Sequence, residues 1–191
     1  MLKSSFLLFS LRNESEFGKL YRSMRSSRRG AGRTINMRFL VQRVSHASVK
    51  VDGQVTGQIG KGFFVLIGVE DEDNKAVADK MISKLLGLRI FDDAEGKSNL
   101  ALADVQGELL LISQFTLYAD ARHGNRPSFI NAGKPEFANE MYEYIVERCR
   151  AEGYTAETGI FGAEMKCELL NDGPFTIWLD SREICPKLHE G

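Results

Sequence analysis

The stretch Phe63-Phe64-Val65-Leu66-Ile67-Gly68-Val69 decides the fold of this chain of 191 residues. It is a continuous apolar run of strand length, preceded by Gly60-Lys61-Gly62. A strand that is apolar at nearly every position requires cover on both faces, so the run predicts a strand at the centre of a sheet. It is among the longest apolar runs of the sequence and is far too short to span a membrane, which excludes a transmembrane protein.

The residues before that run predict two further strands joined by a hairpin. Phe39–Val44 is rich in apolar residues, and apolar and polar residues then alternate through Ala47–Val51, a signal of a half-buried strand. Asp52-Gly53 supplies the residue types that adopt the positive φ angles of a tight turn. Gln54–Ile59 is the predicted return strand.

The residues after the central run predict two helices and several strands. Asp71–Asn74 supplies capping residues to a helix whose apolar side chains recur at helical spacing and that ends near Gly87. A second helix begins at Pro135, which suits a first helical turn, and stops at Gly153. Further strands are predicted over Glu108–Leu117, Thr155–Phe161, Met165–Leu170 and Phe175–Leu179. We therefore expect one α+β domain, in which mixed and antiparallel sheets form a barrel-like core with two principal helices.

The N-terminal segment differs from the rest of the chain. Residues 1–36 are rich in Ser and Arg and poor in acidic residues, which is typical of a transit peptide that directs a protein to an organelle. The same composition fits a disordered tail or an upstream start codon, with a cytoplasmic domain that begins at Met37, and we favour this second interpretation. Residues 1–36 are therefore assigned to an extension, 37–181 to the working domain and 182–191 to a C-terminal tail.

The net negative charge of the working domain limits the ways in which it can bind nucleic acid. Residues 1–36 hold eight of the 25 Lys and Arg and two of the 26 Asp and Glu, so the rest of the chain holds 17 basic and 24 acidic residues, a formal net charge of −7. Non-specific coating of nucleic acid relies on many phosphate contacts, which an acidic body disfavours. If this domain binds RNA, we expect it to do so through a small site.

The common catalytic and metal-binding arrangements are absent from the sequence. Its three Cys form no CxxC pair, which argues for reduced thiols and against a disulfide framework or a cysteine zinc site. His46, His123 and His189 lie at no metal-ligand spacing, and the sequence has no GxSxG turn, P-loop or GxGxxG motif. We therefore predict neither a metal nor a cofactor.

Three polar segments remain as candidates for function. Ser113-Gln114-Phe115-Thr116-Leu117 places hydroxyls and an amide at the end of an apolar strand, and Asn171–Thr176 places a Gly-Pro step between two apolar strands. Arg122–Phe129 combines cations with aromatic and Pro residues, as nucleic-acid-binding segments do. Taken singly, each also fits a structural role: a strand end with satisfied hydroxyls, an ordinary turn and a solvated loop.

Together these segments carry a resemblance. From Met37 to Leu179 the sequence resembles the bacterial and eukaryotic D-aminoacyl-tRNA deacylases, with SQFTL at 113–117 and NDGPFT at 171–176 in the expected order. The Arg126-Pro127-Ser128-Phe129 step belongs to the same resemblance. It implies an esterase that releases D-amino acids and glycine from tRNA, rejects L-aminoacyl-tRNA and serves translation quality control.

The resemblance also implies how the substrate is selected. It implies a homodimer in which the Gly173-Pro174 peptide is cis and reaches into the partner's active site. Asn171 and Met165 are assigned with this peptide to substrate binding and chiral selection. Rigid backbone carbonyls there would bind the α-amino group and leave no room for an L side chain. Selection by exclusion further predicts tolerance of many D-amino acids.

The resemblance favours catalysis without a side-chain nucleophile. Thr116 or Ser113 would need an adjacent base, and no His or carboxylate motif is evident beside either. The implied route is attack by water assisted by the 2′-hydroxyl of the terminal ribose, with backbone N–H groups around Gln114–Thr116 as an oxyanion hole. Ser113 and Gln114 would fix the terminal adenosine or the loop, and Phe115 belongs to the same catalytic segment. Two roles stay open for Met165, which would either pack in the core or line the pocket.

The predicted partner is the 3′ end of an aminoacylated tRNA, bound with the help of Arg122 and Arg126. Two alternatives stay open. A non-catalytic RNA-binding module would bind uncharged RNA with a steep salt dependence. A small-molecule esterase of the same fold would hydrolyse D-amino-acid esters without tRNA.

Overall fold

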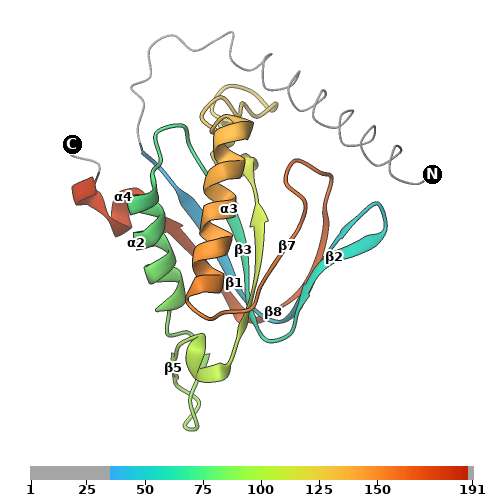
Figure 1. Ribbon diagram of the computed structural model, residues 1–191, viewed down its shortest axis with the longest axis vertical. Coiled ribbons are helices and arrows are strands. Elements are labelled where there is room, and N and C mark those ends of the chain that lie inside the picture. Colours follow the sequence, from blue (N-terminus) through green and yellow to red (C-terminus); the bar gives the residue numbers. More distant parts are fainter. Residues whose placement is uncertain (1–34, 189–191) are drawn as a thin grey trace.

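A computed structural model describes residues 35–188 of the chain, and its core is a six-stranded sheet (Figure 1). The strands are β1 (Arg38–Val51), β2 (Gln54–Ile59), β3 (Gly62–Gly68), β6 (Glu108–Ser113), β7 (Ala156–Thr158) and β8 (Lys166–Asp180). Their order is β2-β1-β3-β6-β7, and β8 pairs with β1. The β3–β6 and β6–β7 pairs are parallel and the others are antiparallel, so the sheet is mixed.

Strand β3 contains the apolar run and lies inside the sheet, between β1 and β6. Phe63, Val65 and Ile67 alternate onto one face and join the main hydrophobic cluster. Phe64 points to the other face and joins a second, smaller cluster. Because successive side chains of a strand point to opposite faces, both faces of β3 are covered by apolar groups, as the sequence predicts.

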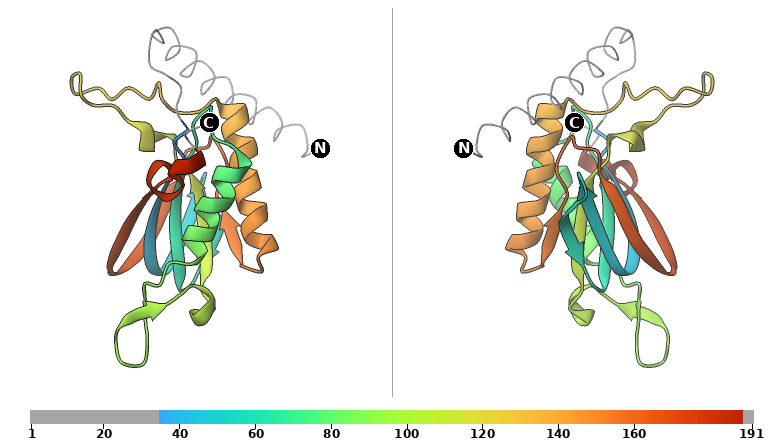
Figure 2. Two further views of the ribbon diagram at one scale, coloured as in Figure 1. Left: turned by 90° about the vertical axis from the view of Figure 1, so that its left-hand side faces the viewer. Right: turned by 90° about the vertical axis from the view of Figure 1, so that its right-hand side faces the viewer.

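Two helices pack against the same face of the sheet (Figures 1 and 2), and these are α2 (Lys75–Leu86) and α3 (Pro135–Ala151). The side chain of Asn74 caps α2 by accepting a hydrogen bond from the backbone N–H of Val77, and the helix ends at Gly87. Pro135 is the first residue of α3, where the missing N–H costs nothing. The two predicted principal helices are confirmed.

The open edges of the sheet approach each other, so that the sheet curls into a nearly closed barrel. A Cβ atom on Gly57 of β2 would lie 2.5 Å from the carbonyl oxygen of Thr158 of β7. Only a glycine permits so close an approach of two backbones. The α+β class and the mixed, barrel-like sheet are thus both present.

The remaining elements are short. They are β4 (Phe91–Asp92), β5 (Ser98–Leu100), the 3-10 turns η1 (Ala103–Val105), η2 (Phe115–Tyr118) and η3 (Pro186–Leu188), and the helix α4 (Ser181–Ile184). Residues 182–188 of the predicted tail therefore include two short helical segments, and Cys185 between them is buried. The predicted extension lies outside the described residues except for 35 and 36, as do residues 189–191 of the tail.

Four predicted strands differ from the observed strands in their bounds. The strand expected over Glu108–Leu117 ends at Ser113 and gives way to η2, and Thr155–Phe161 contains only the three-residue β7. The two strands expected on either side of Gly173-Pro174 are one continuous β8. The reason is the length of β1, which pairs with β8 from Lys50–Lys166 to Arg38–Asp180, with register shifts beside the Gly-Pro step.

Candidate active site

A cavity of about 340 Å³ opens where the parallel strands β3 and β6 end. Its lining is mainly apolar and comes from four parts of the chain: the end of β3, the β6–η2 segment, the start of α3 and the segment before β8. The lining residues are Ile67, Val69, Ile112, Ser113, Gln114, Phe115, Gly133, Pro135, Ala138, Phe161, Gly162, Ala163, Glu164, Met165 and Cys167. A concave, largely apolar site with a few polar groups is typical of small-ligand binding.

The predicted catalytic segment forms one wall of the cavity. Ser113, Gln114 and Phe115 line it, whereas Thr116 does not. The backbone N–H of Gln114 donates to the carbonyl oxygen of Ile67 (2.7 Å), which continues the β3–β6 pairing to the edge of the cavity. The Gln114 side-chain Nε2 donates to Thr116 Oγ1 (2.5 Å), so the Thr116 hydroxyl is held by an amide and not by a base.

Another part of the lining comes from the start of α3 and from residues 161–167, which run into the first residues of β8. Met165, predicted as a pocket residue, lies in this part of the lining. Sequence reasoning missed Phe161, Glu164 and Cys167, which also line the cavity. Phe161 and Glu164 precede β8 and belong to no local motif, and only the long-range fold brings these residues and Cys167 to the ends of β3 and β6.

The titratable groups of the lining are poorly suited to act as a base or nucleophile. The Glu164 side chain is 90% exposed and lies 3.9 Å from Lys166 Nζ. Burial raises the pKa of the Cys167 thiol, so the thiol stays protonated at neutral pH. Within residues 35–188, no His lines the cavity and no group of three His, Cys, Asp or Glu side chains could hold a metal ion.

The Gly173-Pro174 step lies elsewhere in the chain, and its peptide bond is cis. Strand β1 separates β8 from β3, and Arg43 of β1, which pairs with Phe63, donates to the Asp172 carbonyl oxygen (2.9 Å). The cavity residue Ile67 is four residues further along β3, a separation of about 13 Å along the strand. The two predicted motifs are therefore not brought together within one chain.

Polar and aromatic contacts organise the Gly173-Pro174 turn. The Asn171 Oδ1 accepts from the backbone N–H of Phe175 (3.1 Å), and its Nδ2 donates to Thr176 Oγ1 (3.0 Å). The Arg43 guanidinium also lies over the Phe175 ring, 4.4 Å from its centroid. Asn171 thus shapes the turn and, like Gly173-Pro174, is not among the residues lining the cavity.

The predicted tRNA-binding residues lie on an exposed loop next to η2. Asp120 and Ser128 form an isolated bridge that closes this loop, and the ring of Phe129 packs edge-on against Phe115 of the cavity wall (5.3 Å). Arg122 makes an ion pair with Asp120 (2.6 Å), and this guanidinium lowers the pKa of the Asp120 carboxyl. Arg126 is exposed and has no ion pair with any residue of 35–188.

Comparison with known proteins identifies the family. A family model described as "D-Tyr-tRNA(Tyr) deacylase" matches residues 40–180. The chain belongs to this deacylase family. The D-aminoacyl-tRNA deacylase of Anaeromyxobacter dehalogenans is 54% identical over 148 residues, 78% of this chain and 99% of that protein. The D-aminoacyl-tRNA deacylase of Clostridioides difficile is 54% identical over 145 residues, 76% of this chain and 97% of that protein.

A solved structure has the same fold as this chain. The protein described as "c-Myc DNA Unwinding Element Binding Protein" is 40% identical, with a TM-score of 0.70, over 74% of this chain and 97% of that one. The resemblance drawn from SQFTL and NDGPFT is confirmed by these matches, as is the assignment to a hydrolase family. No helix among residues 35–188 has the length and apolar character needed to cross a membrane.

Proposed function

We propose that this protein hydrolyses the ester bond of D-aminoacyl-tRNA, releasing the D-amino acid and the tRNA, and that it also cleaves glycyl-tRNA. The cavity at the end of β6 carries the proposal, because it opens beside Ser113, Gln114 and Phe115 of the family's motif. Its apolar lining suits the base and sugar of a terminal adenosine. The close relatives named D-aminoacyl-tRNA deacylases support the substrate class.

The proposed mechanism uses the substrate's own 2′-hydroxyl to assist attack by water on the ester. Thr116 Oγ1 accepts from the Gln114 amide, and the one carboxylate of the lining, Glu164, is largely exposed. Backbone N–H groups at the start of η2 would stabilise the oxyanion. The N–H of Gln114 donates to the carbonyl oxygen of Ile67, so it is not one of these groups.

Selection of the D configuration is assigned to Gly173-Pro174 of a second copy in a homodimer. The turn is exposed and lies away from the cavity of its own chain, which is the arrangement expected of a group that serves a partner. Its carbonyl groups would hold the α-amino group and exclude an L side chain. A glycyl ester has no side chain to exclude and would therefore be cleaved.

The loop between Asp120 and Ser128 is assigned to tRNA binding. The contact between Phe129 of this loop and Phe115 of the cavity wall supports the assignment, because a tRNA whose 3′ end is in the cavity would pass beside that wall. Arg122 and Arg126 would contact phosphates, which position a nucleic acid without reading its sequence.

The test compares D-Tyr-tRNA and L-Tyr-tRNA as substrates of the full chain. We expect rapid release from the D substrate and an intact L substrate. A D-aminoacyl-tRNA that ends in 2′-deoxyadenosine then tests the mechanism, and it should be cleaved slower by about two orders of magnitude or more. Hydrolysis of neither tRNA by folded protein would refute the proposed activity, and full activity on the deoxy substrate would refute only the mechanism.

A further inference from the structure

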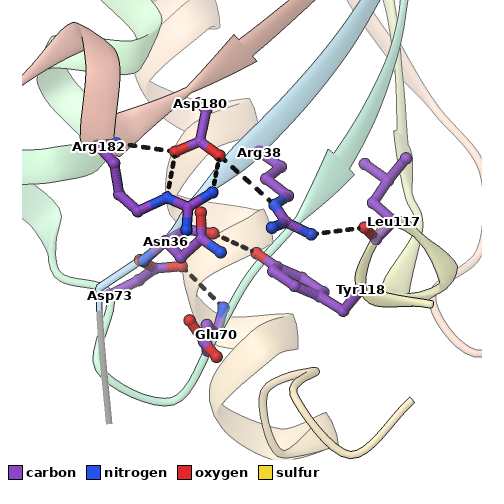
Figure 3. Close-up of polar contacts among 8 residues, drawn as sticks. All are labelled: Asn36, Arg38, Glu70, Asp73, Leu117, Tyr118, Asp180 and Arg182. Carbon is purple, nitrogen blue, oxygen red and sulfur yellow. Dashed lines mark hydrogen bonds and ion pairs between the residues drawn. The ribbon is translucent and has the colours of Figure 1, made fainter. Parts of the chain in front are cut away.

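A cluster of buried polar groups lies behind η2, at the start of β1 (Figure 3). The Arg38 guanidinium donates from Nη1 to the carbonyl oxygen of Leu117 in η2 (2.8 Å). It lies between two rings, 4.8 Å from the centroid of Tyr118 and 5.4 Å from that of Trp178. A planar guanidinium suits this position because it can stack on rings and donate hydrogen bonds at the same time.

A second bond joins the next residue of η2 to the same strand end. Tyr118 is 2% exposed, and its hydroxyl donates to the Asn36 carbonyl oxygen (2.7 Å). Asn36 is fixed in turn by Asp73, whose Oδ1 accepts from the Asn36 N–H (2.9 Å) and whose Oδ2 accepts from the Glu70 N–H (2.7 Å). Two consecutive residues of η2 are thus bonded to the chain just before and at the start of β1.

The other side of the Arg38 side chain meets a buried carboxylate. Asp180, 3% exposed, lies 3.7 Å from Arg38 Nε and is also held by two donors of the Arg182 guanidinium (3.0 and 2.6 Å). Arg38 is therefore held between Asp180 and η2, whereas Arg182 contacts the carboxylate from the solvent side and is 53% exposed. Figure 3 shows both guanidinium groups directed at the same carboxylate.

The turn η2 also packs tightly against strand β3. A Cβ atom on Gly68 would lie 2.9 Å from Tyr118 Cε2 and 3.3 Å from Leu117 Cβ. The turn is thus pressed against a glycine on one side and bonded by Arg38 on another. Because Phe115 and Gln114 line the cavity at the start of the same segment, a shift of η2 by a fraction of an ångström moves the cavity wall.

We propose that Arg38 and Tyr118 are positioning residues, which hold η2 so that Gln114 and Phe115 keep the geometry needed for the reaction. Neither of the two residues is part of the cavity lining. The inference rests on the proposed deacylase activity and adds to it the part of the molecule that fixes the catalytic wall. Misplacement by about 1 Å can lower an enzyme's rate by about two orders of magnitude, so a distant clamp can control the rate.

The experiment compares Arg38→Lys with Arg182→Lys in the full chain, using D-Tyr-tRNA as substrate. Both variants keep a positive charge near Asp180, but a lysine ammonium lacks the fork that joins Asp180 to η2. We expect Arg38→Lys to lower kcat by about tenfold or more with KM changed less than about twofold, because positioning acts in the transition state. Arg182→Lys, the matched control, should keep kcat and show a similar change in Tm.

Two further measurements separate positioning from general loss of stability. Trp178 is the single Trp of the chain, so its fluorescence reports on the Arg38 site and should change in Arg38→Lys more than in Arg182→Lys. Gly68→Ala pushes on Tyr118 with Arg38 intact and should also lower kcat. Its effect and that of Arg38→Lys should be less than additive, since both displace the same turn.

The outcomes distinguish this inference from the proposed function. An inactive wild-type protein would refute the activity, and the inference with it. An active wild type, together with equal kcat values for Arg38→Lys and Arg182→Lys, would refute the inference alone. The inference would also be refuted if Arg38→Lys changed only KM or only Tm and left kcat unchanged.

Discussion

The two motifs that mark the family are held in opposite ways. The SQFTL segment is held by hydrogen bonds to other parts of the same chain. Gln114 is bonded to β3, and the turn η2 is bonded to Asn36 and Arg38. The NDGPFT segment is part of β8, whose Gly173-Pro174 step is exposed and is fastened mainly to Arg43. One segment forms a wall of a cavity, and the other presents a rigid turn away from it.

This difference supports the division of tasks that we propose for the two motifs. A wall that stabilises a transition state must be fixed relative to the bound ester, so it gains from bonds within one chain. A turn that selects chirality in a partner must be rigid in itself and accessible from outside. We therefore expect changes in η2 to reduce rate and changes in the Gly-Pro turn to alter both rate and D/L preference.

The largest expected effect belongs to Gly173→Ala. Gly173 has a φ of +124°, and an added Cβ would lie 2.6 Å from Phe175 Cδ2 and 2.8 Å from Arg43 Nη2. Both the backbone conformation and the contacts oppose an alanine. We expect hydrolysis of D-Tyr-tRNA to fall by about 100-fold or more, or cleavage of L-Tyr-tRNA to appear.

Gly96→Ala is the matched control for that variant. Gly96 also has a positive φ, +75°, but a Cβ there meets nothing within 4 Å, and the residue lies in the turn between β4 and β5. It should share part of the loss of stability and keep both activity and chirality. Wild-type rates and D/L preference in Gly173→Ala would contradict the role of the turn.

The sequence predicts the features of the fold that depend on residues close together in the chain, and it does not predict those that depend on long-range pairing. The hairpin at Asp52-Gly53, the cap at Asn74 and the start of α3 at Pro135 follow from residue types at short spacing, and the structure confirms them. The continuity of β8 through Gly173-Pro174 does not follow, because it depends on pairing with all of β1, some 130 residues earlier in the chain.

The candidate site divides in the same way. Ser113, Gln114 and Phe115 are readable as a polar segment that ends a strand, whereas Phe161–Glu164 lack a motif, and the strand predicted over Met165–Leu170 does not reveal that its first residues line a cavity. The contacts of Arg38 with Leu117 and Asp180 join positions that are distant in sequence. Such contacts come from sheet register, since Arg38 pairs with Gly68 on one side and Asp180 on the other.

The next largest expected effect is a pH dependence of stability caused by Asp73, which is bonded to Asn36, the partner of Tyr118 in η2. Burial raises the pKa of Asp73 from 3.8 to about 6, and the nearby charge of Asp180 adds to the rise, while backbone N–H groups oppose it. Between these two values the folded state keeps a proton that the unfolded state has lost. The stability that Asp73 contributes is therefore present below about pH 4 and is lost as pH rises through about 6, by about 3 kcal/mol in total.

Asp73→Asn isolates this contribution because the amide does not titrate. We expect the free energy of unfolding of the wild type, minus that of Asp73→Asn, to fall between pH 4 and 7 and to be level above pH 7, as measured by urea unfolding. Carboxylates that titrate equally in both proteins cancel in the difference. A difference that is constant or that rises with pH would show that Asp73 is not held in the buried state described here.

A smaller effect is expected in the loop between Asp120 and Ser128, to which we assign tRNA binding. Arg122 is paired with Asp120, whereas Arg126 has no ion pair with any residue of 35–188. A free guanidinium releases counterions when it binds a phosphate, so Arg126→Ala should weaken tRNA binding several-fold and lower the slope of log K against log salt by about one. Arg122→Ala should change both less, and equal effects of the two variants would show that the Asp120 pair opens on binding.

The smallest expected effect is that of Thr116→Ala, and it tests whether the η2 wall acts through its backbone. Thr116 does not line the cavity, and its Oγ1 accepts a hydrogen bond from the Gln114 side chain. If backbone N–H groups and the ribose 2′-hydroxyl carry the reaction, loss of the hydroxyl frees the Gln114 amide and should cost less than about tenfold in kcat. A loss of several orders of magnitude in single-turnover hydrolysis of D-Tyr-tRNA would make Thr116 a nucleophile, and the fixed wall would then act through a side chain and not through its backbone alone.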